Sequence, residues 1–143
     1  MRSGMQTYEF TLERVIPAPV DEVFDSWLDP GIPGKPWHDA DKLIFDPKVD
    51  GLFYVLMQVP HYGRFIRIDR PDAIQHTFVS PNTRGLESLV TVTFQRKGED
   101  TLMRLRHEGL PDDEGGRGHE RGWTFFLGLL VEHFSRRRRS GGS

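Results

Sequence analysis

The sequence predicts an α+β fold in which one curved antiparallel sheet of seven strands packs against one long C-terminal helix. The first observation is a series of short apolar runs separated by breaks rich in Gly, Pro, Asn and Asp, which are typical of hairpins and too short for parallel crossovers. The second is the segment from Gly118 to about Phe134, whose apolar side chains recur at the steps of a packed helix. Because native sheets twist, a sheet of this size is expected to curl around that helix.

The N-terminal part of the chain is expected to form one strand and one short helix. Residues 8–16 alternate between two faces, which is the two-residue period of a strand. Within residues 17–29 the apolar side chains follow helical steps, Pro19 suits the first turn, and the Pro- and Gly-rich run at 30–36 ends the helix.

Six further strands are expected between this helix and the last one. They are predicted at residues 42–47, 51–59, 63–68, 73–79, 88–96 and 101–109. The segment VPHYG, residues 59–63, is interpreted as one of the breaks between strands because it combines a proline with a glycine.

The last helix is expected to begin in the polar, glycine-rich segment 111–118 and to end near Phe134. Residues 137–143 are expected to form a disordered tail, because arginines are followed there by small, flexible residues. The arginines would either stay solvated, where they complement the negative end of the helix dipole, or contact a polyanion. No linker divides the chain, so a single domain is expected over residues 6–136.

Composition argues against several classes of function. The chain has 143 residues with 19 basic and 21 acidic side chains, so it lacks the basic excess of a nucleic-acid or membrane-surface binder. It has no cysteine, which excludes disulfides, thiolate metal sites and cysteine nucleophiles. The longest apolar run, residues 125–131, is too short to cross a bilayer, and the N-terminus lacks the apolar segment of a signal peptide. A cytoplasmic location, with neither nucleic acid nor membrane as a partner, is expected.

The inward faces of the predicted sheet and helix carry large, soft side chains, among them Tyr54, Met57, Phe65, Phe78, Met103 and Trp123. Such side chains either fill a core or line a small-molecule cavity between a curled sheet and its helix. The spacing of these residues does not separate the two possibilities.

Five stretches of the sequence carry a family resemblance. They are LERVIPAPVDEVFDSWLDP, DPKVDGLFYVLM, GRFIRIDRPDAIQHTF, LVTVTFQRKGEDTLMRLRHEGLP and HERGWTFFLGLL. In this order they resemble the activator of heat-shock-protein-90 ATPase homologue-like family, of the START-like (SRPBCC) superfamily, over about residues 8–134. The resemblance implies a helix-grip fold with a cavity between sheet and helix, and a hydrophobic or aromatic small molecule as ligand. One departure is Asp50, where the family pattern has a glycine before Gly51; aspartate tolerates the left-handed backbone of such a turn.

The predicted ligand-binding residues are Trp37, Tyr54, Met57, Phe65, Phe78, Met103, His107, Trp123, Phe126, Leu127 and Leu130. The resemblance places Trp37 beside the cavity entrance. His107 and His119 are expected to approach one mouth of the cavity. His107 is then either a ligand contact or a core residue bonded to Trp123 or to a loop carbonyl.

Two residues of the last helix call for an explanation. Gly122 is unfavourable inside a helix by roughly 1 kcal/mol relative to alanine, and close packing of the helix on the sheet would explain its presence. Trp123 is expected either to anchor the helix in the core or to present its edge to a ligand.

The sequence contains no recognised motif for a metal, a phosphate group or a nucleophile. Residues 37–41 combine a histidine with two aspartates, but they lack the defined spacing of metal ligands. No serine has an evident base beside it. No cofactor is expected, and general acid–base chemistry by His76, His107 or Glu87 is left open.

Three functions therefore remain as hypotheses. The first is a START-like domain that binds a hydrophobic or aromatic small molecule, and the second is a cyclase-, hydratase- or hydrolase-type enzyme that uses the same cavity. The third is a co-chaperone-like module that binds a protein partner, which requires an exposed apolar patch on the outer face of the sheet. A homodimer through the edge strands is also left open.

Overall fold

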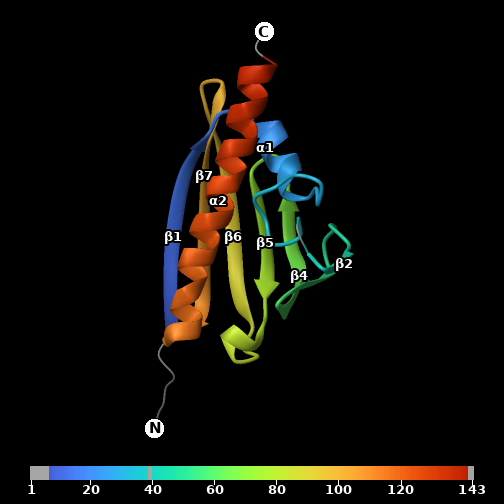
Figure 1. The fold of residues 1–143 in the computed structure, drawn as a ribbon, viewed down its shortest axis with the longest axis vertical. Helices are drawn as coiled ribbons and strands as arrows, with labels where there is room; N and C mark the ends of the chain where they lie inside the picture. Colours follow the sequence, from blue (N-terminus) through green and yellow to red (C-terminus); the bar gives the residue numbers. More distant parts are fainter. Residues whose placement is uncertain (1–6, 39, 142–143) are drawn as a thin grey trace.

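The computed structural model describes residues 7–38 and 40–141, in which a long helix crosses one face of an antiparallel sheet (Figure 1). The elements, in chain order, are β1 (Thr7–Ile16), α1 (Val20–Trp27), β2 (Lys42–Phe45), β3 (Leu52–Met57), β4 (Val59–Asp69), β5 (Ala73–Phe78), the 3₁₀ turn η1 (Pro81–Thr83), β6 (Ser88–Lys97), β7 (Asp100–Pro111) and α2 (Glu114–Ser140). Within the described residues, neither helix combines the length and the apolar character that crossing a bilayer requires.

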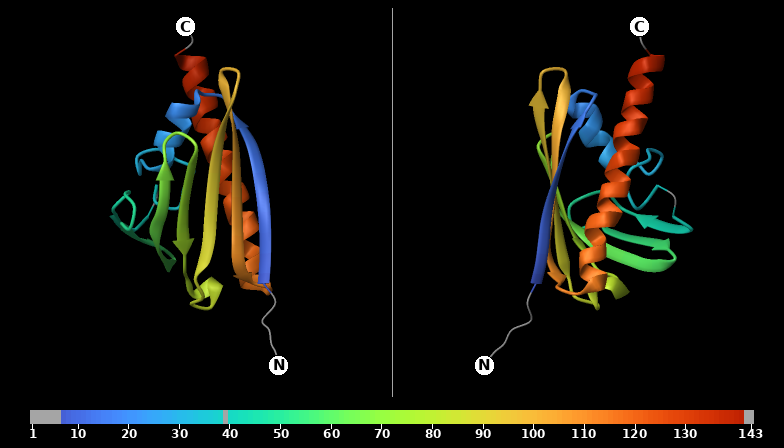
Figure 2. Two further views of the ribbon diagram at one scale, coloured as in Figure 1. Left: turned by 180° about the vertical axis from the view of Figure 1, so that it is seen from behind. Right: turned by 60° about the vertical axis from the view of Figure 1, so that its left-hand side comes forward.

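The sheet has seven strands in the order β1-β7-β6-β5-β4-β3-β2. Strands β2 to β7 form a meander in which each strand pairs with the next, and β1 pairs with β7 at the opposite edge. The views in Figure 2 show this sheet curving around α2. The predicted fold, a curved seven-stranded antiparallel sheet around a long C-terminal helix, is therefore confirmed.

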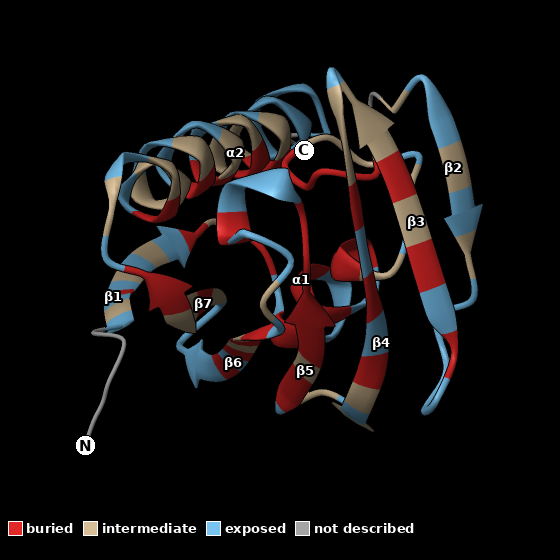
Figure 3. Cartoon of the chain, turned by 90° about the horizontal axis from the view of Figure 1, so that it is seen from below, coloured by how far each residue is buried: buried red, intermediate tan, exposed pale blue. Residues whose placement is uncertain are grey.

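The core lies between the concave face of the sheet and the inner faces of both helices (Figure 3). Helix α1 buries Val20, Val23, Phe24 and Trp27, which follow the three- and four-residue steps of one helical face. Its Trp27 ring stacks on Trp123 of α2, with ring centroids 5.9 Å apart and planes inclined by 22°. The two helices thus share one aromatic contact over the sheet.

Helix α2 begins within the predicted segment 111–118, but it is longer at its C-terminal end than the sequence predicted. It begins at Glu114, where the Asp113 carboxylate accepts a hydrogen bond of 2.8 Å from the Gly116 amide. It continues past Phe134 to Ser140, so residues 137–140 are helical and not a disordered tail; residues 142–143 lie outside the described residues.

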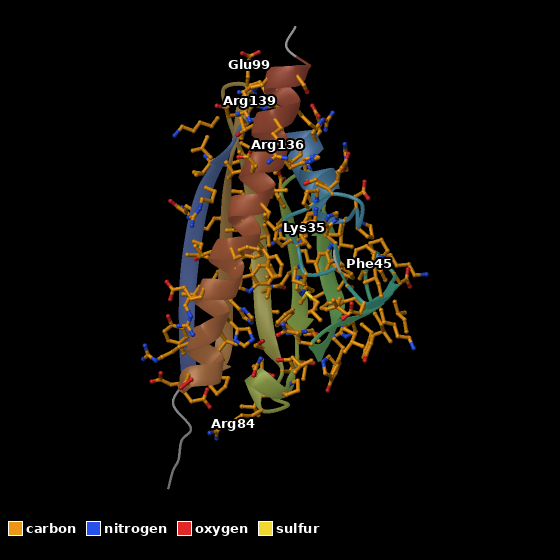
Figure 4. The ribbon with its side chains drawn as sticks, in the orientation of Figure 1. Lys35, Phe45, Arg84, Glu99, Arg136 and Arg139 are labelled. Carbon is orange, nitrogen blue, oxygen red and sulfur yellow. The ribbon has the colours of Figure 1, made fainter. Side chains whose placement is uncertain are left out.

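Contacts with other elements explain the extension of α2 at its C-terminal end. Arg138 forms an ion pair of 2.8 Å with Asp100 of β7, and Arg137 lies 3.6 Å from Glu22 of α1. Arg136 pairs with Glu132 one turn earlier in the helix, at 2.8 Å. Arginines in the last turn also complement the helix dipole. Figure 4 shows Arg136 and Arg139 at this end of α2.

The expected break at residues 59–63 is wrong, because this segment is the start of β4. The connection from β3 is a tight turn in which Met57 pairs with Val59. Gln58 between them adopts a left-handed backbone with a φ of 65°. The turn therefore consists of Gln58 alone, and the proline and glycine of VPHYG lie within β4.

The turn before β3 is as the sequence predicted. Asp50 has a φ of 67°, in the left-handed region that aspartate tolerates. A Cβ on Gly51 would lie 2.0 Å from the carbonyl oxygen of Asp46, so no larger residue fits there. Gly51 alone therefore meets the steric requirement of this strand entry.

Candidate functional site

A hollow of about 510 Å³ opens beside the first half of α2. Its apolar wall is formed by Pro36, Met57, Phe78, Trp123 and Phe126. Its polar wall is formed by His61, Asn82, Glu114, His119 and Arg121. The volume lies in the range of small-molecule sites, which are mostly apolar with a few polar groups.

The side of α2 that faces the hollow carries glycines. Gly115, Gly118 and Gly122 line it, at the three- and four-residue steps that place residues on one helical face. A Cβ on Gly122 would meet no atom within 4 Å, so the expected close packing of the helix on the sheet at Gly122 is wrong. For a Cβ on Gly118 the nearest atom would belong to the Arg121 side chain, at 3.5 Å, which is an ordinary van der Waals contact. The missing side chains therefore leave space that larger residues would occupy.

A chain of hydrogen bonds fixes the protonation of His107 behind the apolar wall. The indole N–H of Trp123 donates to Nδ1 of His107 at 3.0 Å, which is one of the two partners predicted for this histidine. The other ring nitrogen, Nε2, lies 2.8 Å from the Ser88 hydroxyl, and that hydroxyl donates to the Phe78 carbonyl at 2.5 Å. Since Ser88 uses its only proton on Phe78, Nε2 of His107 must carry the proton, and the ring is neutral.

The surroundings of His107 keep it neutral. Burial lowers the pKa of His107 well below its usual value, and nearby His119 and His76 lower it further by charge repulsion. Both ring nitrogens are used inside the protein. His107 therefore positions Trp123 and Phe78 and has no free nitrogen for a ligand.

Two other histidines present their rings to the hollow. His119, in the second turn of α2, lines the hollow with its ring 5.2 Å from that of His107; of these two histidines expected at one cavity mouth, His119 reaches the hollow and His107 lies buried behind it. His61 of β4 packs against Phe78, with ring centroids 5.3 Å apart. Burial lowers the pKa of both His61 and His119. Both imidazoles are therefore mainly neutral near pH 7.

The structure brings only part of the predicted ligand-binding set into the wall of the hollow. Met57, Phe78, Trp123 and Phe126 line it. The buried core beside it contains the other inward residues: Trp37, Phe65, Met103, His107, Leu127 and Leu130. Tyr54 lies on the opposite face of β3 from the buried Phe53 and Val55, because side chains alternate along a strand.

The loop after α1 contributes Pro36 to the wall of the hollow, whereas Trp37 was expected there. Trp37 is only 1% exposed, and its indole N–H donates to the Trp27 carbonyl at 3.0 Å. Its neighbour Pro36 reaches the hollow instead. The sequence also gave no reason to select Asn82, Glu114 or Arg121, whose positions depend on how η1 and α2 meet. His61 was overlooked because it lies in the segment interpreted as a break.

The remaining candidates for acid–base chemistry lie away from the hollow. His76 is fully buried among Trp37, Phe53 and Phe65, and burial lowers its pKa to about 4. Its Nδ1 lies 2.9 Å from the Thr77 carbonyl, so Nδ1 carries the proton. Glu87 is exposed on the loop before β6. Among the described residues, no three His, Cys, Asp or Glu side chains are grouped as metal ligands, and Asp39 lies outside this part of the chain.

Comparison with known proteins identifies one matching family. The family described as "Activator of Hsp90 ATPase homolog 1-like protein" matches residues 17–135. None of the curated proteins compared with the chain matches it.

Among solved structures, protein CV1439 from Chromobacterium violaceum is 22% identical, with a TM-score of 0.73 over 88% of this chain and 96% of that one. Protein MLL2253 from Mesorhizobium loti is 19% identical, with a TM-score of 0.76 over 90% and 98%. PFC0360w, described as an Hsp90 activator from Plasmodium falciparum, is 21% identical, with a TM-score of 0.69 over 96% and 95%. At these identities the structures share the fold, and the match over residues 17–135 shows that the chain belongs to the Activator of Hsp90 ATPase homolog 1-like family.

Proposed function

We propose that this protein binds a small molecule with an apolar or aromatic body in the hollow beside the first half of α2. The observation that carries the proposal is the open face of Gly118 and Gly122, opposite a wall of aromatic and methionine side chains. Aromatic and methionine side chains adapt to flat or irregular apolar ligands. A helix that served only to fill the core would gain stability from larger residues at these glycines.

The contacts of the ionisable groups favour binding over catalysis. His107 and His76 are bonded within the core, and Nδ1 of His119 faces backbone carbonyls of its own helix. General acid–base catalysis commonly relies on a side chain whose pKa is tuned near the working pH and which reaches the reacting atom. The histidines with the strongest burial, His76 and His107, lie outside the wall of the hollow.

Filling the hollow tests the proposal. The probe is N-phenyl-1-naphthylamine, an uncharged aromatic dye whose fluorescence rises in apolar surroundings. Gly122→Leu places a side chain in the open space, and we expect it to weaken binding of the dye by at least about tenfold. Gly128→Leu is the matched control, because Gly128 is also an open glycine of α2 but lies outside the hollow. Equal affinity of the two variants for the dye would count against the hollow as the binding site.

A second candidate function rests on a different surface. Ile44, Tyr54 and Tyr62 lie opposite one another across β2, β3 and β4 on the outer face of the sheet. Ile44 is 58% exposed and Tyr62 is 49% exposed, and with Tyr54 between them they form an apolar stripe that a partner could cover. This outer stripe fits a protein-binding module, and a related fold, PFC0360w, is described as an Hsp90 activator.

The ATPase rate of purified Hsp90 tests this second function. If the outer stripe binds the chaperone, the protein changes the ATPase rate, and Ile44→Lys removes the effect while Gly122→Leu retains it. An unchanged ATPase rate in the presence of excess wild-type protein would rule out this function.

A further inference from the structure

We infer that the ligand of the hollow is uncharged and carries a hydroxyl group, as a phenol does, which donates a hydrogen bond to Nε2 of His119. The inference rests on the proposed function, and it names the class of ligand that the polar wall selects.

The backbone of α2 fixes the tautomer of His119. Nδ1 lies 3.0 Å from the Gly115 carbonyl and 3.1 Å from the Gly116 carbonyl. Carbonyl oxygens only accept hydrogen bonds, so Nδ1 carries the proton. In the neutral ring Nε2 then holds a lone pair, and His119 offers the hollow an acceptor.

The protonation state of His119 supports this role. Burial lowers its pKa, although the two carbonyls and the Asp113 carboxylate act in the opposite direction. Its ring also packs edge-on against Phe78 at 5.9 Å and against His107 at 5.2 Å. A neutral acceptor held between aromatic rings selects a hydrogen-bond donor on the ligand.

His61 is a second imidazole in the wall of the same space. The protein itself holds this ring, because its Nδ1 is buried and hydrogen bonding to the backbone of Val59 and Val55 opposes the lowering of its pKa by burial. The charge of a protonated His119 would lower the pKa of His61, which indicates that the two rings lie near each other. A hydroxyl can donate to the Nε2 acceptor of His119, whereas a purely accepting group cannot.

The charges in the wall argue against an anionic ligand. Glu114 and Arg121 both line the hollow and carry opposite charges, so the wall has no net positive charge while its histidines are neutral. A carboxylate on the ligand would lose its hydration, and a wall in which the charges of Glu114 and Arg121 offset each other does not compensate for that loss. An uncharged donor avoids this cost.

Three naphthalenes of similar shape distinguish a ligand that donates a hydrogen bond from one that does not and from an anionic one. The first, 2-naphthol, donates a hydrogen bond; 2-methoxynaphthalene does not; and 2-naphthoate is an anion. Titration calorimetry at pH 7.5 measures the affinity of each for the wild-type protein. We expect 2-naphthol to bind about fivefold more tightly than 2-methoxynaphthalene, which corresponds to one net hydrogen bond. Tighter binding of 2-naphthoate, or equal binding of naphthol and methoxynaphthalene, overturns the inference.

Variants at His119 assign the preference to that residue. His119→Phe keeps a flat ring but removes the acceptor, and His119→Leu provides a second variant should the first fail to fold. Either variant is expected to bind 2-naphthol and 2-methoxynaphthalene equally. His133→Phe, at a histidine of α2 outside the hollow, is the control and is expected to keep the fivefold ratio. A retained ratio in folded His119 variants contradicts the inference.

The failure of the inference and the failure of the proposed function give different results. If no naphthalene binds, and the dye binds equally to the Gly122→Leu and Gly128→Leu variants, the binding function itself is wrong. If all three bind without preference and Gly122→Leu weakens them together, the hollow binds ligands but does not select a hydroxyl.

Discussion

Lys35 is a lysine buried inside the folded protein. It lies in the loop after α1, beside α2 (Figure 4). Its side chain is 1% exposed, and its Nζ has no hydrogen-bond partner among the described residues. The loop is held there by Gly34, which has a φ of 112° and on which a Cβ would lie 2.6 Å from the Leu130 side chain. A positive charge on Lys35 is therefore expected to be costly in the folded protein.

The cost follows from the pKa. Burial lowers the pKa of Lys35 from 10.5 to about 7, and the charge of Asp29 acts in the opposite direction. Each pH unit between the folded and unfolded values corresponds to about 1.4 kcal/mol, so the full cost of the charge is on the order of 5 kcal/mol. The unfolded chain binds more protons between pH 7 and 10.5. The free energy of unfolding therefore rises with pH in this window, and below about pH 7 the full cost is present.

Lys35→Met removes the amine and keeps a similar shape. We expect the free energy of unfolding of this variant to exceed that of the wild type by roughly 4 kcal/mol at pH 7, and the difference to approach zero near pH 10.5. Urea unfolding of both proteins at pH 7, 8, 9 and 10 measures the difference. Lys48→Met is the control, because Lys48 has a 74% exposed side chain and should show no such trend. A Lys35→Met variant that is less stable than the wild type at pH 7, or a difference in stability that does not change with pH, would show that burial of the Lys35 charge does not destabilise the fold.

Two substitutions in the core test the hydrogen-bonded chain behind the hollow. Trp123→Ala is expected to lower the free energy of unfolding by about 3–5 kcal/mol, because the residue is 2% exposed and its ring stacks on Trp27. A decrease below about 1 kcal/mol in urea unfolding would show that Trp123 is not an important core residue. His107→Phe removes the acceptor of the Trp123 indole N–H and the ring N–H that donates to the Ser88 hydroxyl. We expect the free energy of unfolding to fall by about 1–3 kcal/mol in the same assay. A variant as stable as the wild type would show that these bonds contribute little.

The sequence predicted the architecture because periodicity and short breaks constrain it strongly. The alternation at residues 8–16 placed Phe10 and Ile16 on the buried face of β1, as observed. The C-terminal end of α2 depends on tertiary contacts instead. Arg138 meets Asp100 across 38 positions in sequence, and no local pattern predicts that contact.

The site was predictable only in part. Inward-facing Met57, Phe78, Trp123 and Phe126 follow from strand and helix periods. Which of the inward residues border empty space depends on the rotation of α2 and on the length of the side chains that face it. The step from Gly118 to Gly122 was the available signal, because glycines on one face of a helix remove volume there. Gly122 was instead interpreted alone, as a sign of close packing, and the open space beside it shows the opposite.

A heteronuclear NMR titration tests the central claim that a small molecule occupies the hollow. The amide signals of Gly118 and Gly122 report on the hollow, and those of Gly98 and Gly128 lie outside it. With 2-naphthol as the probe, we expect saturable shifts at Gly118 and Gly122 and little change at Gly98 and Gly128. Shifts confined to Gly98 and Gly128, or no saturable shift at Gly118 and Gly122, would contradict this claim.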